Sequence, residues 1–315
     1  MKLRLSSDTI RLIIPALSLT ILLISVFYLQ PRAMGYLGLN LLFNLAVPIA
    51  LATIAQMLIM TVNDLDLSMG SFVSFIACVT ATFLQSDPAI GVAILLLAIA
   101  VYAGLGVLIH VRDLPSIVVT LGMSFVWSGL AILLLPAPGG HAPEWARAVM
   151  TSRPPLVPMA IVASVIIALF SHFLIMRSSF GVILRGVGGN ARSVERAGWS
   201  ILAARAATYA LAAFFAILAG IALVGLTTSA DANIALRYTL LSIAGVILGG
   251  GEFTGGRVSP IGAVIGALTL TLAGSFLSFL RISSDWQIGA QGAILIVVLG
   301  LRLLLNRMEK KEKRA

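Results

Sequence analysis

The sequence predicts an all-α membrane protein, a helical bundle of about ten transmembrane helices with both termini in the cytoplasm. Hydrophobic residues make up 59% of the 315 positions and charged residues only 10%, whereas a soluble domain carries about 25% charged residues. The mean hydropathy is +1.06, and the apolar residues fall into runs of about 20, long enough to cross a bilayer. Because these runs do not alternate as barrel strands do, helices are the expected spanning elements.

Apolar runs separated by breakers define the expected spans, each roughly 17–25 residues long. They cover residues 11–29, 38–60, 66–85, 89–110, 115–136, 156–176, 205–228, 238–250, 259–280 and 286–305. The second and third runs nearly join, and the eighth is short. The first follows a basic start, but it is longer than the apolar core of a signal peptide and no small-residue cleavage site follows it. We therefore expect one transmembrane domain over residues 1–315.

The basic residues predict the orientation. If ten spans alternate across the membrane, one side holds 16 of the 21 Lys and Arg residues and the other side holds 5. The positive-inside rule makes the richer side cytoplasmic, so both termini and the loop 177–205 are expected inside. This distribution also accounts for the net charge of +9. Since the charges flank spans and form no face with interleaved aromatic residues, no nucleic-acid partner is expected.

The loop 177–205 contains a short helix with punctuated ends. Asn190 suits an N-cap, and Gly198 suits the left-handed position that ends a helix. Ala191, Val194 and Ala197 recur at three-residue spacing and give a narrow apolar stripe. Such a helix can dock into a groove of a cytoplasmic partner, or it can be an ordinary loop helix on the membrane surface. Spacing alone leaves both readings open.

A second unusual stretch runs from residue 245 to residue 266 and is too rich in glycine for a straight span. Gly262 and Gly266 are expected to allow close helix packing. A turn or re-entrant break is expected at the glycines before them, namely Gly250, Gly251, Gly255 and Gly256.

Four stretches follow one another along the chain: Asn63-Asp64-Leu65-Asp66-Leu67-Ser68-Met69-Gly70-Ser71, Leu114-Pro115-Ser116-Ile117-Val118-Val119-Thr120-Leu121-Gly122, the loop from Phe180 to Trp199, and the glycine-rich stretch from Gly249 to Gly266. In this order they resemble the ribose/xylose-type (monosaccharide) ABC transporter permeases. Asn63 and Asp64 stand where that family usually has paired glycines. Ser128 stands where an arginine is frequent, and Ser275 and Ser278 where asparagines are common.

The resemblance implies two sets of functional residues. An ATPase-coupling set is expected at Gly189, Asn190, Arg192, Glu195, Arg196 and Gly198. A substrate-pathway set is expected at Asn44, Asp66, Ser68, Thr120 and Ser275. For Asp64 and Asp66, a second reading is that they are helix-start residues at the membrane surface, where carboxylates favour the positive end of the helix dipole.

The resemblance further implies a permease subunit that carries a monosaccharide into the cell by alternating access. No phosphate-binding GxxxxGK[ST] loop occurs in the sequence, so ATP and Mg are expected on a separate cytoplasmic ABC ATPase and no cofactor or metal on this chain. Further expected partners are a second permease copy or a homologous permease, a periplasmic or lipid-anchored sugar-binding protein, and membrane lipid.

A nucleoside or another small polar solute is an alternative substrate. An ion-coupled secondary transporter is the less favoured alternative, since no convincing carboxylate pair lies deep in a span. An intramembrane enzyme would need a catalytic constellation that the sequence does not present.

Overall fold

The computed structural model describes residues 7–281 and, beyond them, residues 286, 289, 292, 293, 296 and 300. Within this part of the chain the fold is all-helical, and the one β-pairing is an isolated bridge between Gly139 and Ala230. The elements are α1 (Ser7–Leu29), η1 (Pro31–Met34), α2 (Tyr36–Phe43), α3 (Ala46–Thr61), α4 (Met69–Ala81), α5 (Phe83–Ser86), α6 (Pro88–Val111), α7 (Ser116–Leu134), α8 (Glu144–Met150), α9 (Met159–Phe170), the π-helix η2 (Ser171–Met176), α10 (Ser179–Arg196), α11 (Ile201–Thr227), α12 (Tyr238–Leu248) and α13 (Pro260–Phe279). The predicted all-α class is confirmed.

Six helical segments are long and apolar enough to cross a membrane, and the bent pair α2–α3 adds a seventh if it counts as one span. The six are α4 with α5, α6, α7, α9 with η2, α11 and α13. Pro15–Leu29 of α1 and the helix α12 are apolar but shorter. The expected tenth span, 286–305, lies mostly outside the described residues. A multi-span helical membrane protein is therefore confirmed, whereas the count of ten stays a prediction.

The structure breaks several helices that the apolar runs left continuous. The run 38–60 is bent by 40° at Asn44–Leu45, and the run 156–176 changes from α9 into a π-helix at Ser171. The expected loop helix 190–198 is also part of a longer element, since α10 begins at Ser179. Ser178 caps that start by accepting a hydrogen bond from the Gly181 N–H at 3.3 Å.

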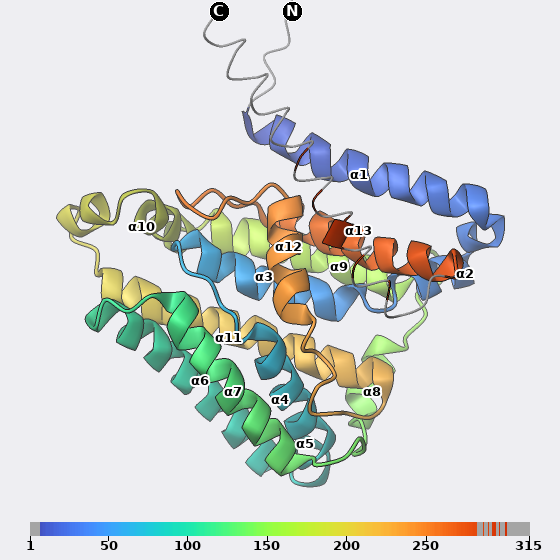
Figure 1. The fold of residues 1–315 in the computed structure, drawn as a ribbon, viewed down its shortest axis with the longest axis horizontal. Helices are drawn as coiled ribbons and strands as arrows, with labels where there is room; N and C mark the ends of the chain where they lie inside the picture. The colour runs from blue at the N-terminus through green and yellow to red at the C-terminus, as the bar shows by residue number, and fades with distance from the viewer. Residues whose placement is uncertain are drawn as a thin grey trace, which may run out of the picture.

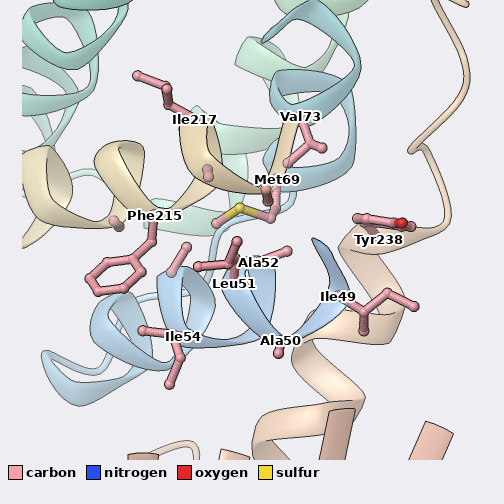
Figure 2. Close-up of a cluster of buried hydrophobic side chains, with 14 of the residues drawn as sticks. Ile49, Ala50, Leu51, Ala52, Ile54, Met69, Val73, Phe215, Ile217 and Tyr238 are labelled. Atoms are coloured by element: carbon pink, nitrogen blue, oxygen red, sulfur yellow. The ribbon is translucent and has the colours of Figure 1, made fainter. Parts of the chain in front are cut away.

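Helix α3 is the centre of the bundle, and every one of its residues is buried. It packs against α11, α12, α13, α9 and α10. Figure 2 shows its side chains Ile49, Leu51 and Ile54 among Met69 and Val73 of α4, Phe215 and Ile217 of α11, and Tyr238 of α12. On the other side of the fold α6 packs along α11, and α7 along α4 (Figure 1). Much of the apolar surface of α1, α6, α7 and α9 stays exposed, as expected for helices that meet lipid or another subunit.

Glycines set the close crossing of α12 and α13. A Cβ on Gly249 or Gly262 would overlap the backbone of the other, and a Cβ on Gly266 would overlap the Gly245 carbonyl. This is the close packing that small residues permit between membrane helices. Ser259 starts α13 by accepting a hydrogen bond from the Gly262 N–H at 3.2 Å, with Pro260 in the first turn.

The bundle has two ends, which we name the α10 end and the α8 end after the helices that lie there. In Figure 1, α10 and α8 lie toward opposite ends of α11. The α8 end gathers the loop after α7 and the loop after α11, which are joined by the Gly139–Ala230 bridge and by the Ala142 N–H to Thr228 carbonyl bond of 3.0 Å. The α10 end gathers three segments of interest, namely residues 62–68 (the α3–α4 loop), α10, and residues 249–258 (the glycine turn).

Candidate functional site

The α3–α4 loop is an extended stretch anchored along its length to neighbouring helices. The chain leaves α3 at Val62 and turns through Asn63, whose φ of +64° lies in the left-handed region that asparagine tolerates. The Leu65 N–H then donates to Ser116 Oγ at 3.1 Å, and the Leu67 N–H donates to Thr120 Oγ1 at 3.0 Å. The polar start of α7 thus supplies acceptors for a backbone that has no strand or helix partner.

Asp66 is fully buried in a hydrogen-bonded cluster. Its Oδ1 accepts from the Ser68 N–H at 2.7 Å and from the Ser68 hydroxyl at 2.6 Å. Its Oδ2 accepts from the Tyr102 hydroxyl of α6 at 2.9 Å. When the Gln56 amide of α3 is oriented so that its donor faces an acceptor, its nitrogen lies 3.1 Å from the Asp66 carbonyl oxygen and its oxygen 3.2 Å from the Asp66 amide nitrogen. The cluster therefore joins the α3–α4 loop to α3 and α6 around one buried residue.

Asp64 forms a second buried contact, with α11. Its Oδ2 lies 3.4 Å from Arg205 Nη1 and accepts from the Tyr209 hydroxyl at 3.2 Å. The Asp64 side chain is 7% exposed and that of Arg205 is 20% exposed. Burial raises the pKa of the Asp64 carboxyl above its ordinary value, and the Arg205 guanidinium opposes that rise, followed by the Tyr209 and Ser116 hydroxyls. The Arg205 guanidinium thus favours the ionised form of this carboxyl against the cost of its burial.

Asn63 connects the α3–α4 loop to the other two segments of the α10 end. Its Nδ2 donates to the Gly188 carbonyl in α10 at 2.7 Å. Its Oδ1 accepts from the Gly255 N–H in the glycine turn at 3.0 Å. One side chain therefore bonds two backbone segments, using both its donor and its acceptor.

The end of α10 beyond its kink, together with the two residues that follow it, is a separate short helix over residues 190–198, which we name the loop helix. Asn190 has non-helical angles (φ −157°, ψ 90°) that kink α10, and its Oδ1 caps the loop helix by accepting from the Ser193 N–H at 3.2 Å. Gly198 ends it at φ +86°. Arg192, Glu195 and Arg196 are exposed on its surface. A groove of about 470 Å³, with Ile183, Val194 and Trp199 among its walls, lies beside it.

The glycine turn has the backbone that its composition predicts. Gly250, Gly255 and Gly256 take φ values of +93°, +86° and +64°, which glycine adopts at little cost. A Cβ on Gly251 would fall 2.8 Å from the Val246 carbonyl oxygen. Within the turn, the Glu252 N–H donates to the Arg257 carbonyl at 3.0 Å, and the two side chains pair at 3.6 Å. Arg257 therefore makes its ion pair within the turn.

Residues 38–299 match the profile of a family described as "Branched-chain amino acid transport system / permease component". The chain belongs to this permease family. Among relatives, the permease is 31% identical over 307 residues to the "Probable ABC transporter permease protein YphD" of Escherichia coli strain K12, covering 93% of this chain and 91% of that one. It is 28% identical over 310 residues to the "Autoinducer 2 import system permease protein LsrC" of Escherichia coli (strain K12 / DH10B), covering 95% and 90%. No solved structure gives a significant match.

Membership confirms the predicted resemblance and the transport role, and it places the permease in the bacterial inner membrane. Membership in an ABC permease family also implies an ATPase partner and a substrate-binding protein.

The permease brings only part of the expected pathway set together. Asp66, Ser68 and Thr120 meet around the α3–α4 loop and are buried. Ser275 of α13 lies elsewhere and donates to the Leu42 carbonyl of α2 at 3.1 Å. Asn44 is exposed at the break between α2 and α3. In this conformation the three clustered side chains are engaged in structural hydrogen bonds, and a pathway role for any of the five stays a prediction.

Sequence reasoning missed several residues of the site. Tyr102 and Tyr209 carry no signal along the chain, because tyrosine is common in membrane helices. Gln56, a polar amide inside an apolar run, is a signal that could have been used. The helix-start reading of Asp64 and Asp66 is wrong, since α4 begins at Met69 and both carboxylates lie in the extended loop before it.

Proposed function

We propose that this permease imports a small neutral polar solute, a monosaccharide or a related furanose, by alternating access driven by a cytoplasmic ABC ATPase. The loop helix carries this proposal. It is capped at both ends, kinked away from the rest of α10, and exposes Arg192, Glu195 and Arg196 beside an apolar groove. A rigid helix with a charged face and an apolar edge suits docking to a partner surface. ATP and Mg would bind to that partner.

The orientation belongs to the same proposal, with ten spans, both termini in the cytoplasm and the α10 end inside. Contacts between loops support it. The α3–α4 loop, α10 and the glycine turn touch one another, and alternating spans put all three on the cytoplasmic side. The loops at the α8 end touch one another as well, and the same alternation puts them outside. The periplasmic or lipid-anchored binding protein would dock there, on a unit made of two permease copies, identical or homologous.

The substrate class is supported by the charges of the interior. Among the described residues, the acidic side chains buried in the bundle are Asp64 and Asp66, and both are engaged in hydrogen bonds. This favours an uncharged solute over ion coupling, which needs carboxylates that can load and release a cation. The import of autoinducer 2 named for one relative is consistent with a furanose. A nucleoside or another small polar solute is the second candidate.

The first test is co-purification of the tagged permease from detergent-solubilised native membranes. Wild type should bring down an ATPase with phosphate-binding loops, and Glu195→Arg should bring down several-fold less because it reverses a charge on the loop helix. Glu144→Arg is the matched control, since Glu144 is likewise exposed but lies in α8 at the other end. If both variants retain the ATPase equally, the loop helix is not the docking element. If wild type retains none under conditions that preserve a known complex, the ATPase-driven proposal fails.

A further inference from the structure

Two adjacent residues of the α3–α4 loop hold the chain on both sides of the loop helix. Asn63 bonds the Gly188 carbonyl, just before the loop helix begins. Asp64 pairs with Arg205 in the first turns of α11, just after it ends. We propose that Asn63 and Asp64 are positioning residues that clamp both flanks of the loop helix to the α3–α4 loop, so that a movement of the loop helix is transmitted to this loop. The proposed function is assumed here only as the source of that movement.

The chemistry of the two residues supports a clamp. Glycine would be sufficient for the left-handed backbone at residue 63. Asparagine adds an amide whose donor bonds α10 and whose acceptor bonds the glycine turn. Aspartate at residue 64 adds a buried charge opposite Arg205. The paired glycines that stand here in ribose/xylose-type permeases would make neither contact. These two departures from the family pattern therefore have one structural explanation.

The backbone segments around the clamp are closely packed. A Cβ on Gly188 would overlap the Thr61 carbonyl of α3 and come within 2.8 Å of Gly256. A Cβ on Gly256 would lie 2.5 Å from the Arg185 carbonyl oxygen. Backbone thus meets backbone where α10 crosses α3 and the glycine turn, and such interfaces shift as units instead of deforming continuously.

Hydrogen bonds also connect the α3–α4 loop to two further helices of the bundle. The α3–α4 loop is bonded to α7 through Ser116 and Thr120 and to α6 through the contact between Asp66 and Tyr102. A displacement imposed on Asn63 and Asp64 would therefore reach the start of α7 and the Tyr102 position within α6 through hydrogen bonds of this loop.

The first experiment needs only the purified full-length permease in detergent. Amide hydrogen exchange is compared between wild type, Asn63→Gly, which keeps the left-handed backbone, and Asp64→Asn, which keeps the shape. Each variant should speed exchange about fivefold over residues 62–68 and 179–204, because about one hydrogen bond is lost from a local opening. Asp113→Gly is the control, since Asp113 also has positive φ (+48°), is exposed in the loop between α6 and α7, and makes no side-chain hydrogen bond with the described residues.

The second experiment uses the complex of the permease with its co-purified ATPase, with and without ATP plus vanadate. In wild type, nucleotide should change exchange in both 179–204 and 62–68. In the double variant Asn63→Gly/Asp64→Asn, the change at 179–204 should persist and the change at 62–68 should fall at least threefold. A clamp that only stabilised the fold would not separate the two segments in this way.

The two experiments separate the possible failures. Unchanged exchange in both single variants of the isolated permease overturns the clamp, whatever the partner is. A nucleotide response at 62–68 that survives in the double variant overturns the transmission. If no ATPase co-purifies, the proposed function fails while the first experiment still decides whether Asn63 and Asp64 hold the loop helix.

Discussion

Removing one hydroxyl from the Asp66 cluster should destabilise the permease measurably. Tyr102→Phe deletes the donor at 2.9 Å from Asp66 Oδ2, and among the described residues no other side chain donates to that oxygen. The aromatic packing of the ring remains, with the Phe72 ring centroid 4.4 Å away. The substitution therefore removes this bond and the 2.9 Å contact between the Tyr102 and Ser68 hydroxyls, while the packing of the ring is kept.

The expected cost follows from the setting of that bond. A buried acceptor that is left without its donor costs about 1–3 kcal/mol. Asp66 is 0% exposed, so water cannot replace the hydroxyl without opening the loop. We expect a loss of about 2 kcal/mol in unfolding free energy. Ser68 keeps both of its bonds to Oδ1, which limits the loss.

The single cysteine of the permease supplies the assay. Cys78 is buried in α4, so its reaction with a fluorogenic maleimide during a thermal ramp in detergent reports loss of that helix's packing. Tyr102→Phe should react at a lower temperature than wild type. Tyr28→Phe, a matched change at a site that is 86% exposed, should not. Equal unfolding temperatures for the two variants would refute the reasoning. So would strict additivity of the stability losses from Tyr102→Phe and Ser68→Ala, because both substitutions act on one carboxylate.

Two further predictions use the same assay. Arg205→Gln should lower the unfolding free energy by on the order of 3 kcal/mol, because it leaves the Asp64 carboxylate buried without its cation. Adding Asp64→Asn to that variant should recover part of the loss. An Arg205→Gln variant as stable as wild type would contradict the ion pair. Gly262→Ala should lower the unfolding free energy by about 1–3 kcal/mol or more, because the added methyl group overlaps the backbone of Gly249. The control Gly122→Ala, whose methyl group meets open space on α7, should be neutral or slightly stabilising. Equal behaviour of these two alanine variants would contradict the close crossing of α12 and α13.

The sequence predicted most of what depends on local chemistry. Runs of apolar residues located the six segments that are long enough to cross a membrane, because bilayer thickness fixes the length of a span. Asn190 and Gly198 predicted both ends of the loop helix, since a side-chain cap and a left-handed terminal residue are local requirements. The glycine turn followed from composition for the same reason.

What could not be predicted depends on residues that are distant along the chain. Asn63 meets Gly188, 125 positions away, and Gly255, 192 positions away, and no local rule pairs them. The sequence also did not predict which helices are buried inside the bundle. The run containing α4 is less apolar than α6, yet much more of it is buried inside the bundle. Hydropathy reports the preference for leaving water, and in a membrane both lipid and the protein interior satisfy it.

Two neighbouring glycines of α10 give the sharpest test of how that helix sits on the bundle. A Cβ on Gly188 would overlap the Thr61 carbonyl and press on Gly256, whereas a Cβ on Gly189 would meet only the Gly255 carbonyl oxygen, at an ordinary 3.8 Å. Alanine favours helix over glycine by about 1 kcal/mol at either position. The two substitutions therefore share their local effect and differ only in the contact they create.

Gly188→Ala should force α10 away from α3, because neither clashing partner is a side chain that can rotate aside. It should break the Asn63 bond to the Gly188 carbonyl and speed amide exchange over residues 62–68 as well as over α10. Gly189→Ala should leave exchange at 62–68 unchanged and slow it slightly within α10. If both variants behave alike, α10 is held by its own helix propensity and its connections, and the contact between α10, α3 and the glycine turn contributes nothing to its position.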